Sequence, residues 1–109
     1  MCDDSAYFER AIAQIMDEAC SLLDCSLPRA KLRVIDQYKG PAYAVPSDEQ
    51  ARFIVEVARR TGLLLDPVYT GKALYGLSLL PNKPARALFL HTGGLPGLLA
   101  DSARFDAFL

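Results

Sequence analysis

Hydrophobic and polar positions follow a three-to-four residue repeat in several parts of the chain. This period places the apolar side chains on one face of a helix, with charged residues on the other face. The repeat is clearest in residues 5–23, where Asp3 or Asp4 stands in position to cap the helix. Ser47 and Gln50 have the spacing of a capping box, and Gly62 suits a helix end. The pattern predicts helices over residues 5–23, 48–62 and 72–80 and from residue 95 to 100.

Three short strand candidates separate these helices, and the second and third have the wholly apolar composition of buried strands. They cover residues 31–35, 63–65 and 87–90. Apolar strands that alternate with helices indicate a parallel sheet covered on both faces. The expected fold class is therefore α/β, as a portion of an open parallel sheet with helices on both faces. Since three strands would leave both sheet edges open, we expect residues 1–109 to be a single segment of a larger domain.

Composition and charge narrow the class of protein. The chain is 51% hydrophobic and 23% charged, with a net charge of −1, so it has the composition of a globular domain. Its basic residues are dispersed among acidic ones, which argues against a nucleic-acid partner. The three cysteines lack a paired spacing, and no apolar run reaches the length of about 18 residues that spans a membrane. These observations favour a soluble cytoplasmic protein with no membrane partner and no metal site.

Two loops follow predicted strands and precede predicted helices. They are Asp66 to Lys72 and His91 to Pro96, and each contains a hydroxyl side chain beside glycine. In open α/β sheets, ligands bind at the carboxyl ends of the strands. The two loops therefore predict a crevice for a planar, polar cofactor.

Together with a third loop, these two segments indicate a family. The loop from Tyr38 to Pro46 reads Y-x-G-P-x-Y-x-x-P, the loop from Asp66 to Lys72 reads D-P-V-Y-T-G-K, and the last begins H-T-G-G-x-P at His91. In this order they resemble the C-terminal part of D-cysteine desulfhydrases and of the related 1-aminocyclopropane-1-carboxylate deaminases. The resemblance implies an enzyme that depends on pyridoxal 5'-phosphate and has the tryptophan-synthase-β-like fold. The segment between the last two motifs is shorter here than in typical members.

The resemblance also implies roles for individual residues. Tyr43 matches a tyrosine that faces the substrate, and Tyr69 matches one that packs near the pyridine ring, so both are candidate catalytic residues. Thr70 and Thr92 match hydroxyl positions beside the pyridine nitrogen. Gly93, like its neighbour Gly94, matches a glycine that lets the main chain approach the cofactor. The predicted cofactor-binding residues are Tyr69, Thr70, Thr92 and Gly93.

The two threonines separate the branches of the family. In the deaminase branch the position of Thr70 is usually glutamate, and the position of Thr92 is usually leucine. Threonine at both favours the desulfhydrase branch, a carbon–sulfur lyase that converts D-cysteine to pyruvate, sulfide and ammonia by β-elimination. The alternatives are the deaminase branch and a non-catalytic fragment or subunit that needs an N-terminal partner.

The family's Schiff-base lysine lies upstream of the segment that matches this chain. We therefore expect the chain alone to be inactive and to require the remainder of the enzyme or a partner chain, with a homodimer as the complete form and a small amino acid as substrate. Lys72 is expected to support the cofactor loop, and His91 is expected to be structural.

Overall fold

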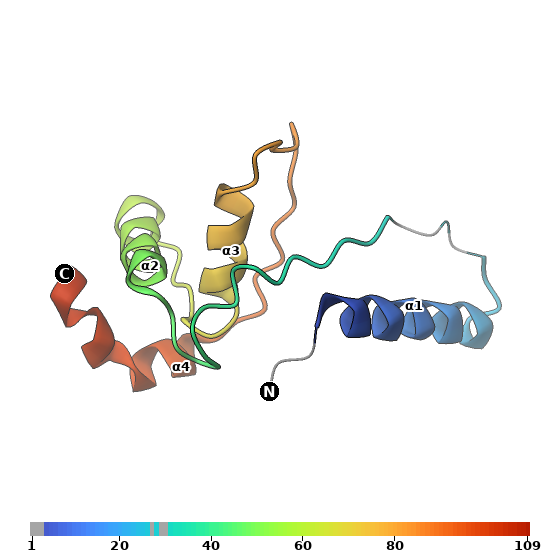
Figure 1. Cartoon of the computed structure of the whole chain (residues 1–109), viewed down its shortest axis with the longest axis horizontal. Coiled ribbons are helices and arrows are strands. Elements are labelled where there is room, and N and C mark those ends of the chain that lie inside the picture. Colours follow the sequence, from blue (N-terminus) through green and yellow to red (C-terminus); the bar gives the residue numbers. More distant parts are fainter. Residues whose placement is uncertain (1–3, 27, 29–30) are drawn as a thin grey trace. The chain divides into compact units, whose positions relative to one another are not determined.

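The computed structural model describes residues 4–26, 28 and 31–109. The chain forms two compact units, residues 1–36 and residues 37–109. The helices in chain order are α1 (Ser5–Leu22), α2 (Asp48–Thr61), α3 (Thr70–Ser78) and α4 (Leu95–Ala100), followed by the 3₁₀-helix η1 (Ser102–Phe108) (Figure 1). In the part of the chain that is described, no helix combines the length and apolar character needed to cross a membrane.

The first unit contains α1, which confirms the helix predicted over residues 5–23. Asp4 caps it, since the amide of Tyr7 donates to Asp4 Oδ1 at 2.8 Å; Asp3, the other predicted cap, lies outside the described residues. None of the residues of α1 is buried, and Ile15 is 62% exposed. The apolar stripe of this helix is therefore not covered within its own unit.

The second unit is built around α2, which begins and ends where the sequence predicts. Ser47 Oγ accepts from the amide of Gln50, and Gln50 Oε1 accepts from the amide of Ser47, so the capping box is formed. Gly62 terminates the helix with φ of 75°. Both ends of α2 are thus set by residues within four positions along the chain.

The core of the second unit is small. Its buried apolar residues are Ala51, Ile54, Val55, Leu65 and Phe105. Helix α3 packs closely against α2 at Gly71. A Cβ on Gly71 would lie 2.5 Å from Ile54 Cδ1, so the contact leaves no room for a side chain there. Helix α3 also begins and ends two residues before the predicted range. The 3₁₀-helix η1, which the sequence pattern did not predict, contributes Phe105 to this core.

The predicted open parallel sheet is wrong for this chain. In the described ranges the structure contains no strand, and its β-type pairing is the isolated bridge between Ala42 and Val45. Residues 31–35, 63–65 and 87–90 have no regular secondary structure. Strand hydrogen bonds come from a neighbouring strand, and an apolar run cannot supply that neighbour itself. Leu88 is accordingly 94% exposed instead of being covered by helices.

Candidate functional site

A buried aspartate organises the loop that leads into α3. Asp66 is 2% exposed, and its Oδ1 accepts from the amides of Val68 and Tyr69, both at 2.7 Å. Its Oδ2 accepts from the amide of Thr70 at 2.9 Å and from the Thr70 hydroxyl. The Thr70 hydroxyl in turn accepts from the amide of Asp66 at 2.9 Å. The carboxylate therefore satisfies amides at the start of α3, where the helix dipole also favours negative charge.

These hydrogen bonds determine the charge state of Asp66. Burial by itself raises the pKa of a carboxyl group, since it removes water from the charged form. The hydrogen bonds from the Thr70 hydroxyl and from the three amides outweigh burial, so the pKa of Asp66 lies below its ordinary value. Asp66 is thus an anion at neutral pH, although it is almost fully buried.

The third loop lies over the same carboxylate. A Cβ on Gly94 would come within 2.5 Å of Asp66 Oδ2, and Gly94 has φ of 112°. His91 fixes the start of this loop: its Nε2 lies 3.0 Å from the carbonyl oxygen of Leu64, and its Nδ1 accepts from the amide of Gly93 at 3.1 Å. Because Nδ1 acts as acceptor, the proton is on Nε2, and the imidazole joins this loop to the segment of Leu64.

The two predicted catalytic tyrosines lie together. The hydroxyl oxygens of Tyr43 and Tyr69 are 2.8 Å apart, and the ring centroids are 6.3 Å apart with the planes at 68°. Tyr43 and Tyr69 are 67% and 61% exposed. Two phenols joined by a hydrogen bond at an exposed position can contact a ligand with one hydroxyl while the other holds or supplies a proton.

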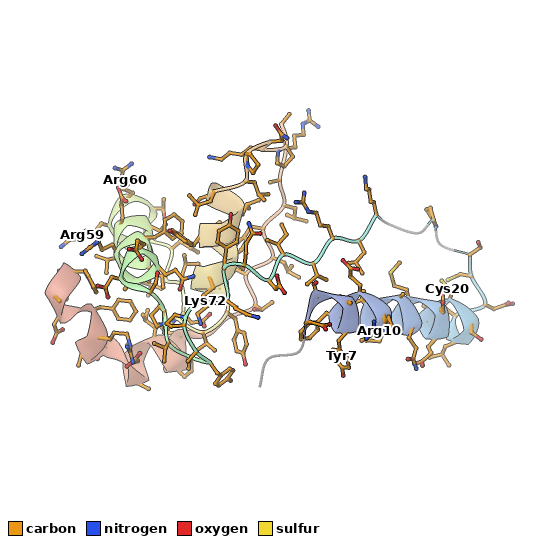
Figure 2. All side chains as sticks on the ribbon, viewed as in Figure 1. Tyr7, Arg10, Cys20, Arg59, Arg60 and Lys72 are labelled. Carbon is orange, nitrogen blue, oxygen red and sulfur yellow. The ribbon has the colours of Figure 1, made fainter. Side chains whose placement is uncertain are left out.

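The loop that carries Tyr43 is attached to α2 and α3 by two polar side chains. Lys72, which is labelled in Figure 2, lies in the first turn of α3 and is 8% exposed. Its Nζ donates to the carbonyl oxygens of Lys39 at 2.7 Å and Ala42 at 3.2 Å. Gln50 Nε2 donates to the carbonyl oxygen of Tyr38 at 2.7 Å. The position of Tyr43 therefore depends on residues of two helices.

The remaining predicted site residues lie on the third loop and at the start of α3. Thr92 and Gly93 are exposed, and a Cβ on Gly93 would meet no atom within 4 Å. Thr70, in contrast, is 3% exposed and its hydroxyl bonds to Asp66. The structure thus joins Tyr43 to Tyr69 and connects Thr70, through Asp66, to the loop of Thr92 and Gly93.

The roles of Asp66 and Lys72 in this arrangement go beyond what the sequence predicts. Asp66 is the first residue of the predicted loop and has no predicted role, although an aspartate four positions before the first helical threonine is a local capping pattern. Lys72 was expected to support the cofactor loop, but its contacts are with the loop of Tyr43. No local sequence pattern predicts these contacts, since they join residues 30 and 33 positions apart.

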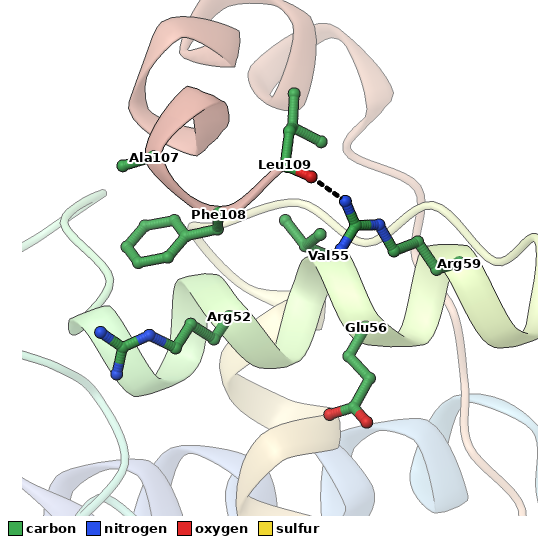
Figure 3. A pocket seen from close by; sticks show the side chains of 7 residues that line it. All are labelled: Arg52, Val55, Glu56, Arg59, Ala107, Phe108 and Leu109. Atoms are coloured by element: carbon green, nitrogen blue, oxygen red, sulfur yellow. Dashed lines mark hydrogen bonds between the residues drawn. The ribbon is translucent and has the colours of Figure 1, made fainter.

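A separate pocket lies between α2 and the C-terminal segment and contains none of the predicted site residues. Its volume is about 470 Å³. Arg59 donates to the main-chain oxygen of Leu109, and the Arg52 guanidinium lies 5.4 Å from the centre of the Phe108 ring (Figure 3). These contacts attach the C-terminal segment to α2.

Among the described residues, no group of three or more histidine, cysteine, aspartate or glutamate side chains could hold a metal ion.

The exposed parts of the loops fit one side of a pyridoxal-phosphate ring. No atom lies within 4 Å of a Cβ placed on Gly93, so the main chain there is open to a ligand, and the exposed Tyr69 ring offers a surface for packing. The Thr70 hydroxyl, in contrast, is buried and bonds to the carboxylate and the amide of Asp66, so it supports this surface from beneath. The amino group of Lys72 donates to two carbonyl oxygens of the Tyr43 loop.

Comparison with known proteins identifies relatives that match most of the chain. It is 49% identical over 72 residues to a putative 1-aminocyclopropane-1-carboxylate deaminase of Thermotoga maritima, a match that covers 65% of this chain and 23% of the relative. It is 42% identical over 94 residues to D-cysteine desulfhydrase of Yersinia pestis, covering 82% of this chain and 28% of the relative. A bifunctional D-cysteine desulfhydrase/1-aminocyclopropane-1-carboxylate deaminase of Arabidopsis thaliana, described as mitochondrial, is 38% identical over 104 residues, covering 90% of this chain and 25% of the relative.

The chain is therefore homologous to the C-terminal part of the D-cysteine desulfhydrase and 1-aminocyclopropane-1-carboxylate deaminase family, and the resemblance seen in the three motifs is confirmed. The chain spans about a quarter of the length of the curated relatives it matches. No family model matches the sequence. No solved structure matches it either.

Proposed function

We propose that this chain supplies the tyrosine-bearing side of a pyridoxal-phosphate site in a D-cysteine desulfhydrase-type lyase. The observation that carries this proposal is the 2.8 Å contact between the hydroxyls of Tyr43 and Tyr69, which lie in two of the three motifs shared with the family. The reaction is β-elimination of D-cysteine to pyruvate, sulfide and ammonia. The cofactor supplies the electron sink when it is bound, so the residues of the chain need to orient it and manage protons.

Each predicted site residue has a part in this proposal. Tyr43 faces the substrate and exchanges a proton with it through its hydroxyl, while the Tyr69 hydroxyl holds Tyr43 in place and the Tyr69 ring packs on the cofactor. Thr70 and Thr92 surround the pyridine nitrogen, and Gly93 lets the main chain approach the ring. Because the Thr70 hydroxyl donates to anionic Asp66, it would accept a hydrogen bond from the ring nitrogen in the protonated form of the pyridine ring.

The lysine that binds the cofactor has to come from elsewhere in this proposal. Lys72 is committed to the loop of Tyr43, and the matched relatives are about four times as long as the segment they share with this chain. The partner is therefore the remaining, N-terminal part of such an enzyme, either on the same polypeptide or as a separate chain, with a homodimer as the complete form. The cytoplasmic location expected from the sequence stays a prediction.

A chimera tests the proposal. In it, the 94-residue segment of the Yersinia pestis D-cysteine desulfhydrase that matches this chain is replaced by the corresponding residues of this chain. The chimera should bind pyridoxal phosphate and release sulfide and pyruvate from D-cysteine, whereas this chain alone with the cofactor should not. The variant Tyr43→Phe should lower the rate by about 10²-fold or more, the usual effect of losing a group that transfers a proton. A matched control is Tyr75→Phe, because this half-buried tyrosine packs against Phe53 and lies outside the three motifs.

A folded chimera that binds the cofactor and releases no product from D-cysteine would contradict the proposal.

The second candidate function is opening of the cyclopropane ring of 1-aminocyclopropane-1-carboxylate, which the 49% identity to the Thermotoga maritima relative favours. Turnover of the two substrates by the same chimera separates the branches. Sulfide release from D-cysteine supports the lyase, and ammonia release from the cyclopropane amino acid alone supports the deaminase.

A further inference from the structure

Lys72 differs from the other lysines of the chain in its surroundings. Lys31, Lys39 and Lys83 are exposed, whereas Lys72 is 8% exposed. A buried ammonium group is unfavourable unless protein acceptors replace the lost water. Lys72 Nζ has such acceptors in the carbonyl oxygens of Lys39 and Ala42. The side chain thus bridges the first turn of α3 and a loop about 30 residues earlier in the sequence.

Both carbonyl groups come before Tyr43 in the chain, and that of Ala42 begins the turn that presents Tyr43. The amide of Val45 donates to the carbonyl oxygen of Ala42 at 3.2 Å, which closes a turn with Tyr43 and Ala44 at its centre. Ala44 has φ of 57°, a left-handed conformation that a residue other than glycine adopts at a cost of about 1–2 kcal/mol. External contacts therefore have to hold this turn, and Lys72 bonds directly to the carbonyl group at its first position.

The beginning of the same loop is packed around the Lys72 amino group. Gly40 has φ of 78°, and a Cβ there would lie 2.8 Å from the carbonyl oxygen of Val45 and 3.2 Å from Lys72 Nζ. The loop can approach the amino group this closely only because Gly40 lacks a side chain. Since Lys72 and Tyr69 are three positions apart at the start of α3, one short segment supplies both the anchor of the loop and the hydroxyl that meets Tyr43.

We propose that Lys72 is a positioning residue that holds the Tyr38–Val45 loop on α3 and so places the Tyr43 hydroxyl against the Tyr69 hydroxyl. Replacing Lys72 by a side chain without a donor leaves the carbonyl group of Lys39 without this partner and the carbonyl group of Ala42 with the amide of Val45 alone, and the loop then moves out to water. The tyrosine pair separates as a result, although neither tyrosine is altered. The importance of the pair for catalysis rests on the proposed function, but the positioning itself does not.

The positioning is tested on the full chain by nuclear Overhauser effects between tyrosine ring protons. The native chain should show a cross-peak between the Tyr43 and Tyr69 rings, and Lys72→Met should lose it. The contact between Phe53 and Tyr75, whose centroids are 5.4 Å apart, reports in the same spectrum whether α2 and α3 remain packed. Lys39→Met is the matched control, because it removes an exposed ammonium group from the same loop and leaves the main-chain acceptor of Lys39 in place.

Restoring the amino group distinguishes positioning from a general packing effect. Lys72→Cys, made with Cys2, Cys20 and Cys25 replaced by serine, can be alkylated with 2-bromoethylamine to give a side chain of nearly the length of lysine. The Tyr43–Tyr69 cross-peak should be absent before alkylation and present after it. A cross-peak that persists in Lys72→Met or in the unalkylated cysteine variant would overturn the proposal, and so would a failure of alkylation to restore it in a chain that keeps the Phe53–Tyr75 contact.

A measurement on the unsubstituted chain covers the case in which the variants do not fold. With ¹⁵N-labelled lysine, the Lys72 ammonium protons should exchange with water more slowly than those of Lys31, Lys39 and Lys83. They should also show through-hydrogen-bond coupling to the carbonyl carbon of Lys39. Fast exchange of all four ammonium groups would contradict the proposal.

A double-mutant cycle in the chimera connects the positioning to activity. If Lys72 acts through Tyr43, the losses in kcat/KM caused by Lys72→Met and Tyr43→Phe should not add in the double variant. Full additivity would exclude an action of Lys72 through Tyr43. An inactive chimera would count against the proposed lyase function and leave the result from the cross-peaks standing, so the two failures are distinguishable.

Discussion

Gly94 lies over the carboxylate of Asp66, so close that a Cβ on Gly94 would come within 2.5 Å of Asp66 Oδ2. The same carboxylate accepts hydrogen bonds from the amides of Val68, Tyr69 and Thr70. One buried anion therefore connects the start of α3 with the loop that carries Thr92 and Gly93. This contact, together with the hydrogen bond between His91 and the carbonyl oxygen of Leu64, sets the relative position of two of the three family motifs.

The contact predicts different effects for two adjacent glycines. Both have positive φ, 95° for Gly93 and 112° for Gly94, so alanine is strained at either position, at about 1–2 kcal/mol. At Gly93 the new methyl group meets open space, whereas at Gly94 it collides with Asp66. We expect Gly94→Ala to lower the free energy of unfolding by about 3 kcal/mol or more and Gly93→Ala by about 1–2 kcal/mol. Urea denaturation measures both, and equal losses would contradict the close contact.

The charge of Asp66 predicts a dependence of stability on pH. Its pKa is lower in the folded chain than the ordinary value of 3.8, so the folded state binds the proton less readily than the unfolded state. The contribution of Asp66 to stability is therefore complete above about pH 4 and is lost as the pH falls through the lowered pKa. Asp66→Asn should cost about 2–3 kcal/mol at pH 7 and flatten the loss of stability between pH 5 and pH 2.

Glu49→Gln is the control for this pH dependence. The pKa of Glu49 is also lowered, first by a hydrogen bond to its own main chain and then by one to Ser47, but its carboxylate is exposed at the start of α2. Glu49→Gln should change the loss of stability between pH 5 and pH 2 less than Asp66→Asn does. An unfolding profile of Asp66→Asn that runs parallel to that of the native chain at acidic pH would contradict the assigned role of Asp66.

Two neighbouring leucines test the location of the core. Leu65 is fully buried at 0% exposure, and Leu64 is 47% exposed. Leu65→Ala should cost about 2–5 kcal/mol because it leaves a cavity, and Leu64→Ala should cost less than about 1 kcal/mol. The main-chain oxygen of Leu64 that meets His91 is unaffected by the second change. Chemical denaturation followed by circular dichroism gives both values, and the reverse order would be inconsistent with this core.

The capping box of α2 predicts a local effect with a simple rescue. Ser47→Ala removes the acceptor of the Gln50 amide and should cost about 1 kcal/mol. Ser47→Asp keeps an acceptor at the same position and should restore most of this loss. Hydrogen exchange of the first-turn amides of α2 should rise in Ser47→Ala and return toward the native rate in Ser47→Asp. Unchanged exchange in Ser47→Ala would show that the cap does not stabilise the helix.

The sequence predicts the helices well because their signals are local. Ser47 and Gln50 satisfy each other three positions apart, and Gly62 ends α2 through its own backbone conformation. The predicted sheet was wrong because the same reasoning does not extend to strands. An apolar run such as residues 87–90 has the composition of a strand, but its hydrogen bonds have to come from another segment, and in the described residues no strand is formed.

The sequence alone also determined the family, because three motifs in a fixed order are preserved whether or not their loops are in contact. The tertiary structure decided how these motifs are arranged. It joined Tyr43 to Tyr69 across 26 positions and placed the Lys72 amino group on the carbonyl groups of Lys39 and Ala42. The physical reason is the range of the interactions. Caps and turns depend on neighbours within four residues, whereas these contacts exist only after α2 and α3 have packed and brought distant loops together.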